Sequence, residues 1–233
     1  MTLLDIVGLS KDYQALRPLR VARLTVNAGD VMSIGGLDAA AAETLVHLIT
    51  GVTLPNEGQV TLFGQNTRAI ADGESWLKSL DRVGMITTRG IVIEAFSVLQ
   101  NIAMSYTLDV DPIDPRVVPR TGELARSVGL DPAVFDLPAG TVAPDVQMRV
   151  QLARSLALDP TLLIAEHPSA ALARDTVAAF GADLSRAARS RGLALVTITA
   201  DDVLAKAIGG SRLELSPATG ELRAPGLLKK LFG

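Results

Sequence analysis

The fold class is decided by residues 149–172, whose sequence is RVQLARSLALDPTLLIAEHPSAAL. Thr161 to Ala165 form an apolar run that is too continuous for a strand exposed on either face, which is typical of a buried parallel strand. Apolar residues at helical spacing then predict a long helix from about Ala170 to Arg191, and a second apolar strand is expected over Leu193 to Thr199. This strand–helix–strand order predicts an α/β fold in which helices cover a parallel sheet.

The N-terminal side of the chain shows the same alternation of strands and helices. Strands are expected over Leu3 to Val7, Leu19 to Val26, Val31 to Ile34, Gln59 to Phe63 and Val83 to Thr87, and a helix over Ala39 to Thr50. The stretch from about Arg89 to Arg154 is predicted to be mainly helical, with loops at 109–115 and 137–140. Because this stretch interrupts the alternation, we expect it to form an inserted lobe.

The composition excludes several classes of protein. The 233 residues are 48% hydrophobic and carry a net charge of −3 without a basic block, so nothing indicates nucleic-acid binding. The chain has no cysteine, which excludes disulfides and thiolate metal sites. Its start does not read as a secretion signal, and its apolar runs are shorter than the roughly 18 residues of a membrane span. We expect a soluble protein of a reducing compartment.

Six segments, in order along nearly the whole chain, resemble the ATP-binding cassette domain of ABC transporters. They are LSKDYQ (9–14), NAGDVMSIGG (27–36), TLVHLITGVTLPNEGQVTLFGQ (44–65), VLQNIAM (98–104), the stretch 149–172 and RGLALVTITADD (191–202). The resemblance implies a P-loop NTPase-like parallel sheet flanked by helices, with an antiparallel β subdomain and an inserted α-helical lobe. It implies one nucleotide-binding domain over 1–233, with an α/β core at 1–88 and 155–216, a lobe at about 89–154 and a tail at 217–233.

The phosphate loop of this family departs from its pattern here. In the family, backbone N–H groups and a lysine hold the ATP phosphates, and a Ser/Thr hydroxyl holds Mg²⁺. The pattern Gly-x-x-Gly-x-Gly-Lys-Ser-Thr matches Gly36, Leu37, Asp38, Ala39, Ala40, Ala41, Ala42, Glu43 and Thr44. Gly36 and Thr44 keep the family's residues, whereas alanines stand in place of two glycines and the lysine, and Glu43 stands in place of the serine.

These replacements weaken the attraction for a polyanion. A charge pair about 4 Å apart is worth about 4 kcal/mol at an effective dielectric constant of 20, so the absent lysine removes an attraction of that order. Asp38 and Glu43 add repulsion. The alanine run favours helix, so we expect the helix to begin early and to fill the phosphate cradle. The loop therefore predicts weak or no binding of ATP and Mg²⁺, with no cofactor or metal expected.

The family's catalytic positions are changed as well. The Asp-Glu pair that ends the Walker B strand matches Glu166 and His167, and the switch histidine matches Ala200. His167 has two interpretations: it fills space at a strand end, which we favour, or it accepts a proton, since an imidazole titrates near about 6.5. No catalytic residue is expected, and ATP hydrolysis is not expected.

Other positions that contact nucleotide in the family differ too. Thr88 matches the glutamine that senses the γ-phosphate, Ala173 matches the aspartate after Walker B, and residues 142–146 (VAPDV) match the signature Leu-Ser-Gly-Gly-Gln. Tyr13 holds the place of the aromatic residue that stacks on adenine, although a lone aromatic at a strand end more often packs. The tail LLKKLF (227–232) is interpreted as a packed turn, with docking on a partner or a membrane surface as the alternative.

The resemblance implies partners and a place in the cell. It implies a homo- or heterodimer with another cassette subunit and an integral-membrane permease, and hence a cytoplasmic protein at the inner face of the plasma membrane. The residues favour a non-hydrolysing subunit first and a nucleotide-independent scaffold or regulatory module second. A weak ATPase that uses Glu166 and His167 is the third hypothesis.

Overall fold

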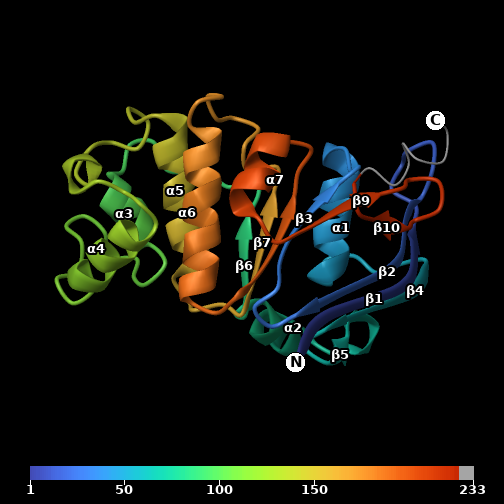
Figure 1. The fold of residues 1–233 in the computed structure, drawn as a ribbon. Coiled ribbons are helices and arrows are strands. Elements are labelled where there is room, and N and C mark those ends of the chain that lie inside the picture. The colour runs from blue at the N-terminus through green and yellow to red at the C-terminus, as the bar shows by residue number, and fades with distance from the viewer. Residues whose placement is uncertain (226–233) are drawn as a thin grey trace.

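The computed structural model describes residues 1–225 and contains two sheets with helices on both sides of the larger one (Figure 1). The larger sheet has six strands in the order β10-β9-β3-β8-β7-β6, and all neighbours except β10 and β9 run parallel. The smaller sheet is antiparallel and has the order β2-β1-β4-β5. The expected parallel sheet, antiparallel β subdomain and flanking helices are therefore confirmed.

The elements have the following bounds. The strands are β1 Thr2–Lys11, β2 Leu19–Asn27, β3 Val31–Gly35, β4 Glu57–Leu62, β5 Gln65–Asn66, β6 Val83–Ile86, β7 Leu162–Glu166, β8 Ala194–Ile198, β9 Ser211–Leu215 and β10 Leu222–Arg223. The helices are α1 Ala39–Ile49, α2 Gly73–Leu80, α3 Val98–Ala103, α4 Val118–Ser127, α5 Pro144–Leu156, α6 Val177–Ser190 and α7 Asp202–Ile208, with short 3-10 turns at Thr67–Ala69 and Pro132–Val134.

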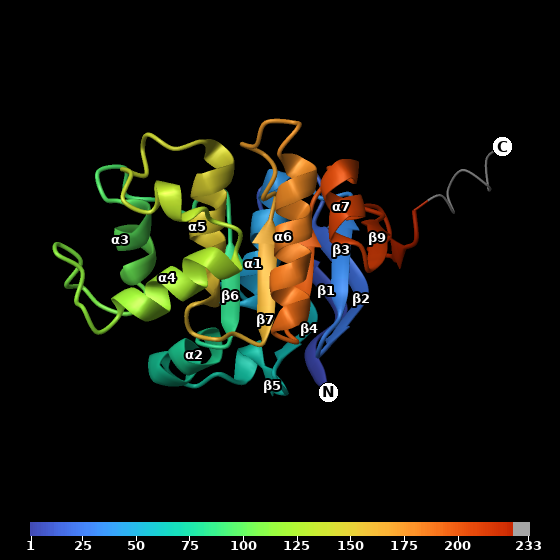
Figure 2. The same cartoon turned by 60° about the vertical axis from the view of Figure 1, so that its left-hand side comes forward.

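The central strands are buried on both faces, as their continuous apolar sequence predicts. In β7, Leu162 and Ile164 belong to a core cluster shared with α1 and the smaller sheet. Leu163 and Ala165, which point the other way, belong to a second cluster shared with α3 to α6. Figures 1 and 2 show the elements that carry these clusters on the two sides of the sheet, with α5 and α6 on one side and α1 and the smaller sheet on the other. The ends of β3, β7 and β8 therefore meet at one edge between two packed layers.

The region between β6 and β7 holds three helices joined by long loops. α3, α4 and α5 pack on one another, away from the smaller sheet (Figure 2). The segments 104–117 and 128–143 contain no α-helix, so this region is less helical than the sequence predicts. Pro112 and Pro115 in the first segment lack the N–H group that a helix interior requires.

The helix expected from Ala170 begins only at Val177, so that part of the prediction is wrong. Residues 170–176 form successive turns, in which the Thr176 hydroxyl donates to the Ala173 carbonyl. Arg174 reaches across to Asp201, with 2.9 Å between Nη1 and Oδ2. The local bond of Thr176 competes with a helix, and the bond of Arg174 draws the segment toward another element.

No helix within residues 1–225 is long and apolar enough to cross a membrane. The tail segment 227–232, for which a packed turn is predicted, lies outside the described residues.

Candidate nucleotide site

The loop that leaves β3 is shaped by close backbone packing. Gly36 has φ +80°, a conformation that favours glycine, and a side chain there would collide with the carbonyl oxygen of Leu215 on β9. Gly36 is thus required by the contact between the loop and the neighbouring strand, whether or not a phosphate is bound. Leu37, the next residue, is buried in the core.

The N-terminus of α1 is capped by a carboxylate of the chain itself. Asp38 is the N-cap residue, and its Oδ1 accepts a hydrogen bond of 2.8 Å from the N–H of Ala41. The helix begins at Ala39, ahead of the position of the family's lysine, so the expectation of an early helix start is confirmed. Asp38 therefore supplies a negative group at the helix end, where the helix dipole favours an anion.

The first turn of α1 offers no cationic side chain. Ala42 is completely buried and Ala41 nearly so, because both face the core, while Ala39 and Ala40 are exposed. The Thr44 hydroxyl donates to the Ala40 carbonyl at 2.7 Å. The residue that matches the lysine has thus become part of the hydrophobic core.

One arginine joins the two acidic residues that replace metal-binding groups. Arg89 Nη1 lies 2.9 Å from Glu43 Oε1, and Nη2 lies 3.0 Å from Glu166 Oε2. Glu43 comes from α1 and Glu166 from the end of β7, so the guanidinium bridges a helix and a strand of the core. The Glu166 side chain is 1% exposed, whereas Glu43 and Arg89 are 40% and 43% exposed.

Arg89 was missed by the sequence analysis, which used it only as the start of the lobe. Its two partners are far away in sequence, at positions 43 and 166, and no spacing rule connects them. The available signal was chemical: two glutamates on buried elements near a phosphate loop require a cation.

His167 follows the buried glutamate in a left-handed conformation with φ 44°. Its N–H donates to the Ile198 carbonyl at 2.8 Å, while its Nε2 is buried without a hydrogen-bond partner among the described residues. In the described part of the chain, no hydrogen bond joins the His167 side chain to Arg89 or Glu166. The imidazole is therefore held apart from the ion pairs.

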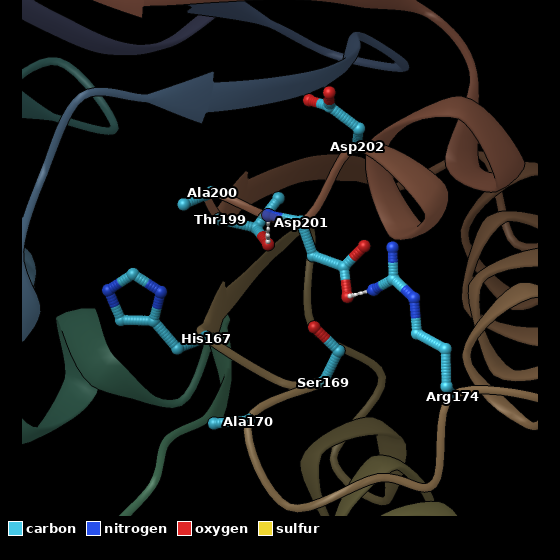
Figure 3. Close-up of a pocket in the computed structure, with 8 residues that line it drawn as sticks. All are labelled: His167, Ser169, Ala170, Arg174, Thr199, Ala200, Asp201 and Asp202. Atoms are coloured by element: carbon cyan, nitrogen blue, oxygen red, sulfur yellow. Dashed lines mark hydrogen bonds and ion pairs between the residues drawn. The ribbon is translucent and has the colours of Figure 1, made fainter.

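His167 instead lines a pocket of about 460 Å³ at the ends of β7 and β8 (Figure 3). The pocket residues are His167, Ser169, Ala170, Arg174, Thr199, Ala200, Asp201 and Asp202. In the close-up, the imidazole and the Arg174–Asp201 pair lie on opposite sides of the pocket, and Ala200, the position of the switch histidine, carries only a methyl group.

Asp201 is tied to the start of α7. Its Oδ1 accepts from the N–H groups of Val203 and Leu204 at 2.9 and 3.3 Å. Burial acts to raise its pKa, but these two bonds, the Ser169 hydroxyl and the charge of Arg174 together lower the pKa below its usual value. The pocket therefore contains a paired carboxylate at neutral pH.

The acidic side chain in the segment that matches the signature motif is also paired with a cationic side chain of the same chain. α5 begins at Pro144, which has no N–H group, and Asp145 Oδ2 lies 2.7 Å from Arg149 Nη1. Arg149 is largely buried and also pairs with Asp183 of α6, with 2.7 Å between Nη2 and Oδ2. Arg149 thus joins α5 to α6, and the acidic residue of this segment is paired within α5.

The remaining positions are spread around the site. Tyr13 is partly buried against the core, and its pKa is raised by burial and by the negative charge of Asp38, which places it beside the loop. Thr88 is exposed next to Arg89, and Ala173 lies in the turns before α6. Stacking of an adenine on Tyr13 stays a prediction.

These residues do not fit a magnesium nucleotide. The groups that face the loop are the carboxylates of Asp38, Glu43 and Glu166, and the nearby guanidinium of Arg89 already pairs with two of them. Among residues 1–225, no group of three or more His, Cys, Asp or Glu side chains is arranged to hold a metal ion. A polyphosphate at this loop would meet the like charges of Asp38 and Glu43.

Comparison with known proteins gives a consistent result. A family profile described as ABC transporter matches residues 19–170. The lipoprotein-releasing system ATP-binding protein LolD of Acinetobacter baylyi is 29% identical over 78% of this chain and 80% of its own length. The methionine import ATP-binding protein MetN of Caulobacter vibrioides is 33% identical over 76% of the chain, which spans only 52% of that relative.

Solved structures share the fold. CbiO1 from Clostridium perfringens, part of the ABC transporter complex cbiONQ, has a TM-score of 0.77 at 19% identity, covering 99% of this chain and 90% of its own. The dimeric bacterial ABC transporter cassette MJ0796 has a TM-score of 0.74 at 21% identity, covering 95% and 97%. These likenesses concern the arrangement of helices and strands.

Proposed function

We propose that this chain, which belongs to the ABC transporter family of ATP-binding cassettes, is a non-hydrolysing subunit that pairs with another cassette subunit and a permease. The observation that carries the proposal is the pair of contacts from Arg89 to Glu43 and Glu166. A guanidinium stands between the two residues that match metal-binding positions, and the matching lysine position is a buried alanine. Both glutamates thus have a cationic partner without nucleotide.

The signature segment supports the same proposal for the second half of a dimer. In the family's head-to-tail dimer, each nucleotide lies between one subunit's phosphate loop and the other's signature. Here Asp145 takes the place of a signature glycine and is paired with Arg149. Both composite sites of a heterodimer would therefore be altered, so the partner must function with a poor signature opposite its own loop.

A membrane partner is supported by a groove beside β6 that has three exposed apolar side chains on its lining. Its pocket has a volume of about 330 Å³ and includes the exposed side chains of Met85, Ile91 and Leu158. Exposed apolar side chains gathered in one concavity are typical of an interaction site. We assign this groove to the permease, which would place the subunit at the cytoplasmic face of a membrane.

A scaffold that needs no nucleotide is the second candidate, favoured by the same ion pairs. The two candidates differ in assembly. A transporter subunit requires a cassette partner and a permease, whereas a scaffold keeps its oligomeric state in isolation. Sedimentation with and without MgATP, and with a co-expressed cassette subunit and permease from a neighbouring gene, separates them.

The decisive experiment is titration with a fluorescent ATP analogue and Mg²⁺. We expect no saturable binding by the wild-type chain and no phosphate release above background. The test variant carries Ala42→Lys, Glu43→Ser and Arg89→Gln, which restores the cation and the hydroxyl and removes the competing guanidinium. Ala40→Lys is the matched control, because it adds the same charge on the exposed side of α1. Micromolar binding by the wild type would refute the proposal.

A further inference from the structure

We propose that Arg89 is a positioning residue that fixes the helical lobe of α3, α4 and α5 on the α/β core without nucleotide. Arg89 lies in the segment 87–97 that leads from β6 to α3, which we call the strap. Its side chain turns back to Glu43 on α1 and Glu166 on β7, two elements of the core. The side chain of Arg89 therefore attaches the strap to the core.

The same strap is also held by side chains of α5. Gln151 Nε2 donates to the Gly90 carbonyl at 3.0 Å, and Arg154 Nη1 donates to the Ile91 carbonyl at 2.7 Å. These two carbonyls directly follow Arg89 in the chain. The core and α5 thus contact adjacent residues of the strap.

The far end of the strap is fixed by a buried amide. Asn101 on α3 is fully buried, and its side chain accepts from the Ile93 N–H at 2.8 Å and donates to the Ile93 carbonyl at 3.0 Å. Its Nδ2 also donates to the Ser97 carbonyl at 3.0 Å. The strap has defined backbone contacts along its length and transmits the position of Arg89 to α3.

Charge and burial explain why this attachment persists. An unpaired carboxylate as buried as Glu166 is strongly unfavourable, so its pairing holds Arg89 in place. Glu43 binds the other nitrogen of the same guanidinium and fixes its direction. In the family the residue before Arg89, here Thr88, is the glutamine that responds to nucleotide; in this chain the neighbouring residue makes a permanent contact instead.

The test measures the distance between lobe and core directly. The chain has no cysteine, so spin labels can be attached at Glu123→Cys on α4 and Gln59→Cys on β4, both exposed positions. We expect one narrow distance distribution for the otherwise wild-type chain and the same distribution with MgATP. Arg89→Met should broaden the distribution, and Arg89→Lys, whose ammonium lacks the planar fork that serves two carboxylates, should broaden it less.

Controls separate a positioning role from general loss of stability. Arg116→Met removes an exposed arginine of the lobe that pairs, within residues 1–225, only with the nearby Asp114, and it should leave the distribution unchanged. If Arg89→Met does not fold, Glu43→Gln removes the exposed partner alone and should shift the distribution in the same direction. An Arg89→Met distribution equal to the wild-type one, in a folded protein, overturns the inference.

The measurement with MgATP rests on the proposed function. A failure of that function can be distinguished from a failure of the role of Arg89. A wild-type distribution that moves with MgATP overturns the independence from nucleotide. If MgATP binds in the fluorescence titration but leaves the distribution unchanged, the proposed function fails while the role of Arg89 stands. If MgATP does not bind and Arg89→Met has no effect, only the role of Arg89 fails.

Discussion

Arg89 Nη2 lies 3.0 Å from Glu166 Oε2, and this contact joins the segment that enters the helical lobe to the last residue of a fully buried strand. The two residues are 77 positions apart in the chain. A contact of such range can form only when the core and the connecting segment have both reached their final positions. The pair therefore belongs to the tertiary structure rather than to any local element.

Arg89→Met should destabilise the protein more than Glu43→Gln. Removing the partner of a buried charge costs about 3–5 kcal/mol, and solvent at the half-exposed guanidinium reduces this to about 1–3 kcal/mol. Loss of the exposed Glu43 contact should cost less than about 1 kcal/mol. Denaturant unfolding measures both values, and Arg116→Met should stay within about 0.5 kcal/mol of wild type. Equal losses in the two variants would contradict this ranking.

Arg89→Met should also create a response to divalent cations. Without the guanidinium, the carboxylates of Glu43 and Glu166 face a shared space, and oxygen ligands suit Mg²⁺ and Mn²⁺. A ligand that binds the folded state raises its stability, so millimolar Mg²⁺ should raise the melting temperature of the variant but not that of the wild type. The effect should disappear when Glu166→Gln is added, and an equal response in that double variant would rule out this site.

Ala42→Lys alone should destabilise the chain. Ala42 is completely buried, so a longer side chain must displace core neighbours, at about 1–3 kcal/mol. The exposed Ala40→Lys variant should change stability by less than about 0.5 kcal/mol. Thermal unfolding of the two variants is the measurement, and similar melting temperatures would show that the first turn of α1 has room for a lysine.

His167 should tolerate asparagine better than valine. Its φ of 44° lies in the left-handed region, which asparagine enters readily and a β-branched residue does not. We expect His167→Val to be less stable than His167→Asn by about 1–3 kcal/mol in chemical unfolding. His167→Asn should not change phosphate release, which we expect to stay at background in both proteins. A valine variant as stable as the asparagine one would mean that the backbone at this position relaxes easily.

Asp201→Ala should lower stability at neutral pH and less so in acid. The pKa of Asp201 is lowered in the folded protein, where burial is outweighed by the N–H groups of Leu204 and Val203, the Ser169 hydroxyl and Arg174. A carboxyl group whose pKa is lower in the folded state stabilises the fold at pH values above its unfolded-state pKa of about 3.9. This contribution is lost as the pH falls through the pKa of the folded state.

At neutral pH the variant should lose about 1 kcal/mol, the usual value of an N-cap carboxylate. Urea unfolding at neutral pH and at about pH 3 measures the difference, which should shrink in acid. If the stability difference between the variant and the wild type instead grew in acid, this role of the ionised carboxylate would be excluded.

The fold could be predicted from the sequence because its signals are local. The apolar run at β7 and the alternation in β2 specify burial on two faces and on one face, respectively. The start of α6 could not be predicted, since the apolar spacing continues upstream while Arg174 is drawn to Asp201, a partner on another element. Helix periodicity carries no information about such a distant bond.

The motif names Asp38, Ala42 and Glu43 as candidate site residues, but it does not give their contacts. That Asp38 caps α1 is seen only in the structure. The partner of Glu43 could not be found, because Arg89 belongs to no motif and meets it only in the folded chain. Charges that balance across the fold are visible only in three dimensions.

Gly36 survives in the altered loop because the carbonyl oxygen of Leu215 leaves no room for a side chain. A mutational scan of this loop would therefore find Gly36 intolerant and the neighbouring Ala39 and Ala40, which are exposed, permissive. If such a scan were interpreted as a map of ligand binding, the intolerance of Gly36 would be attributed to contact with a phosphate. In a cassette of this kind, mutational sensitivity at Gly36 measures the spacing of β3 and β9, and nucleotide recognition has to be measured separately.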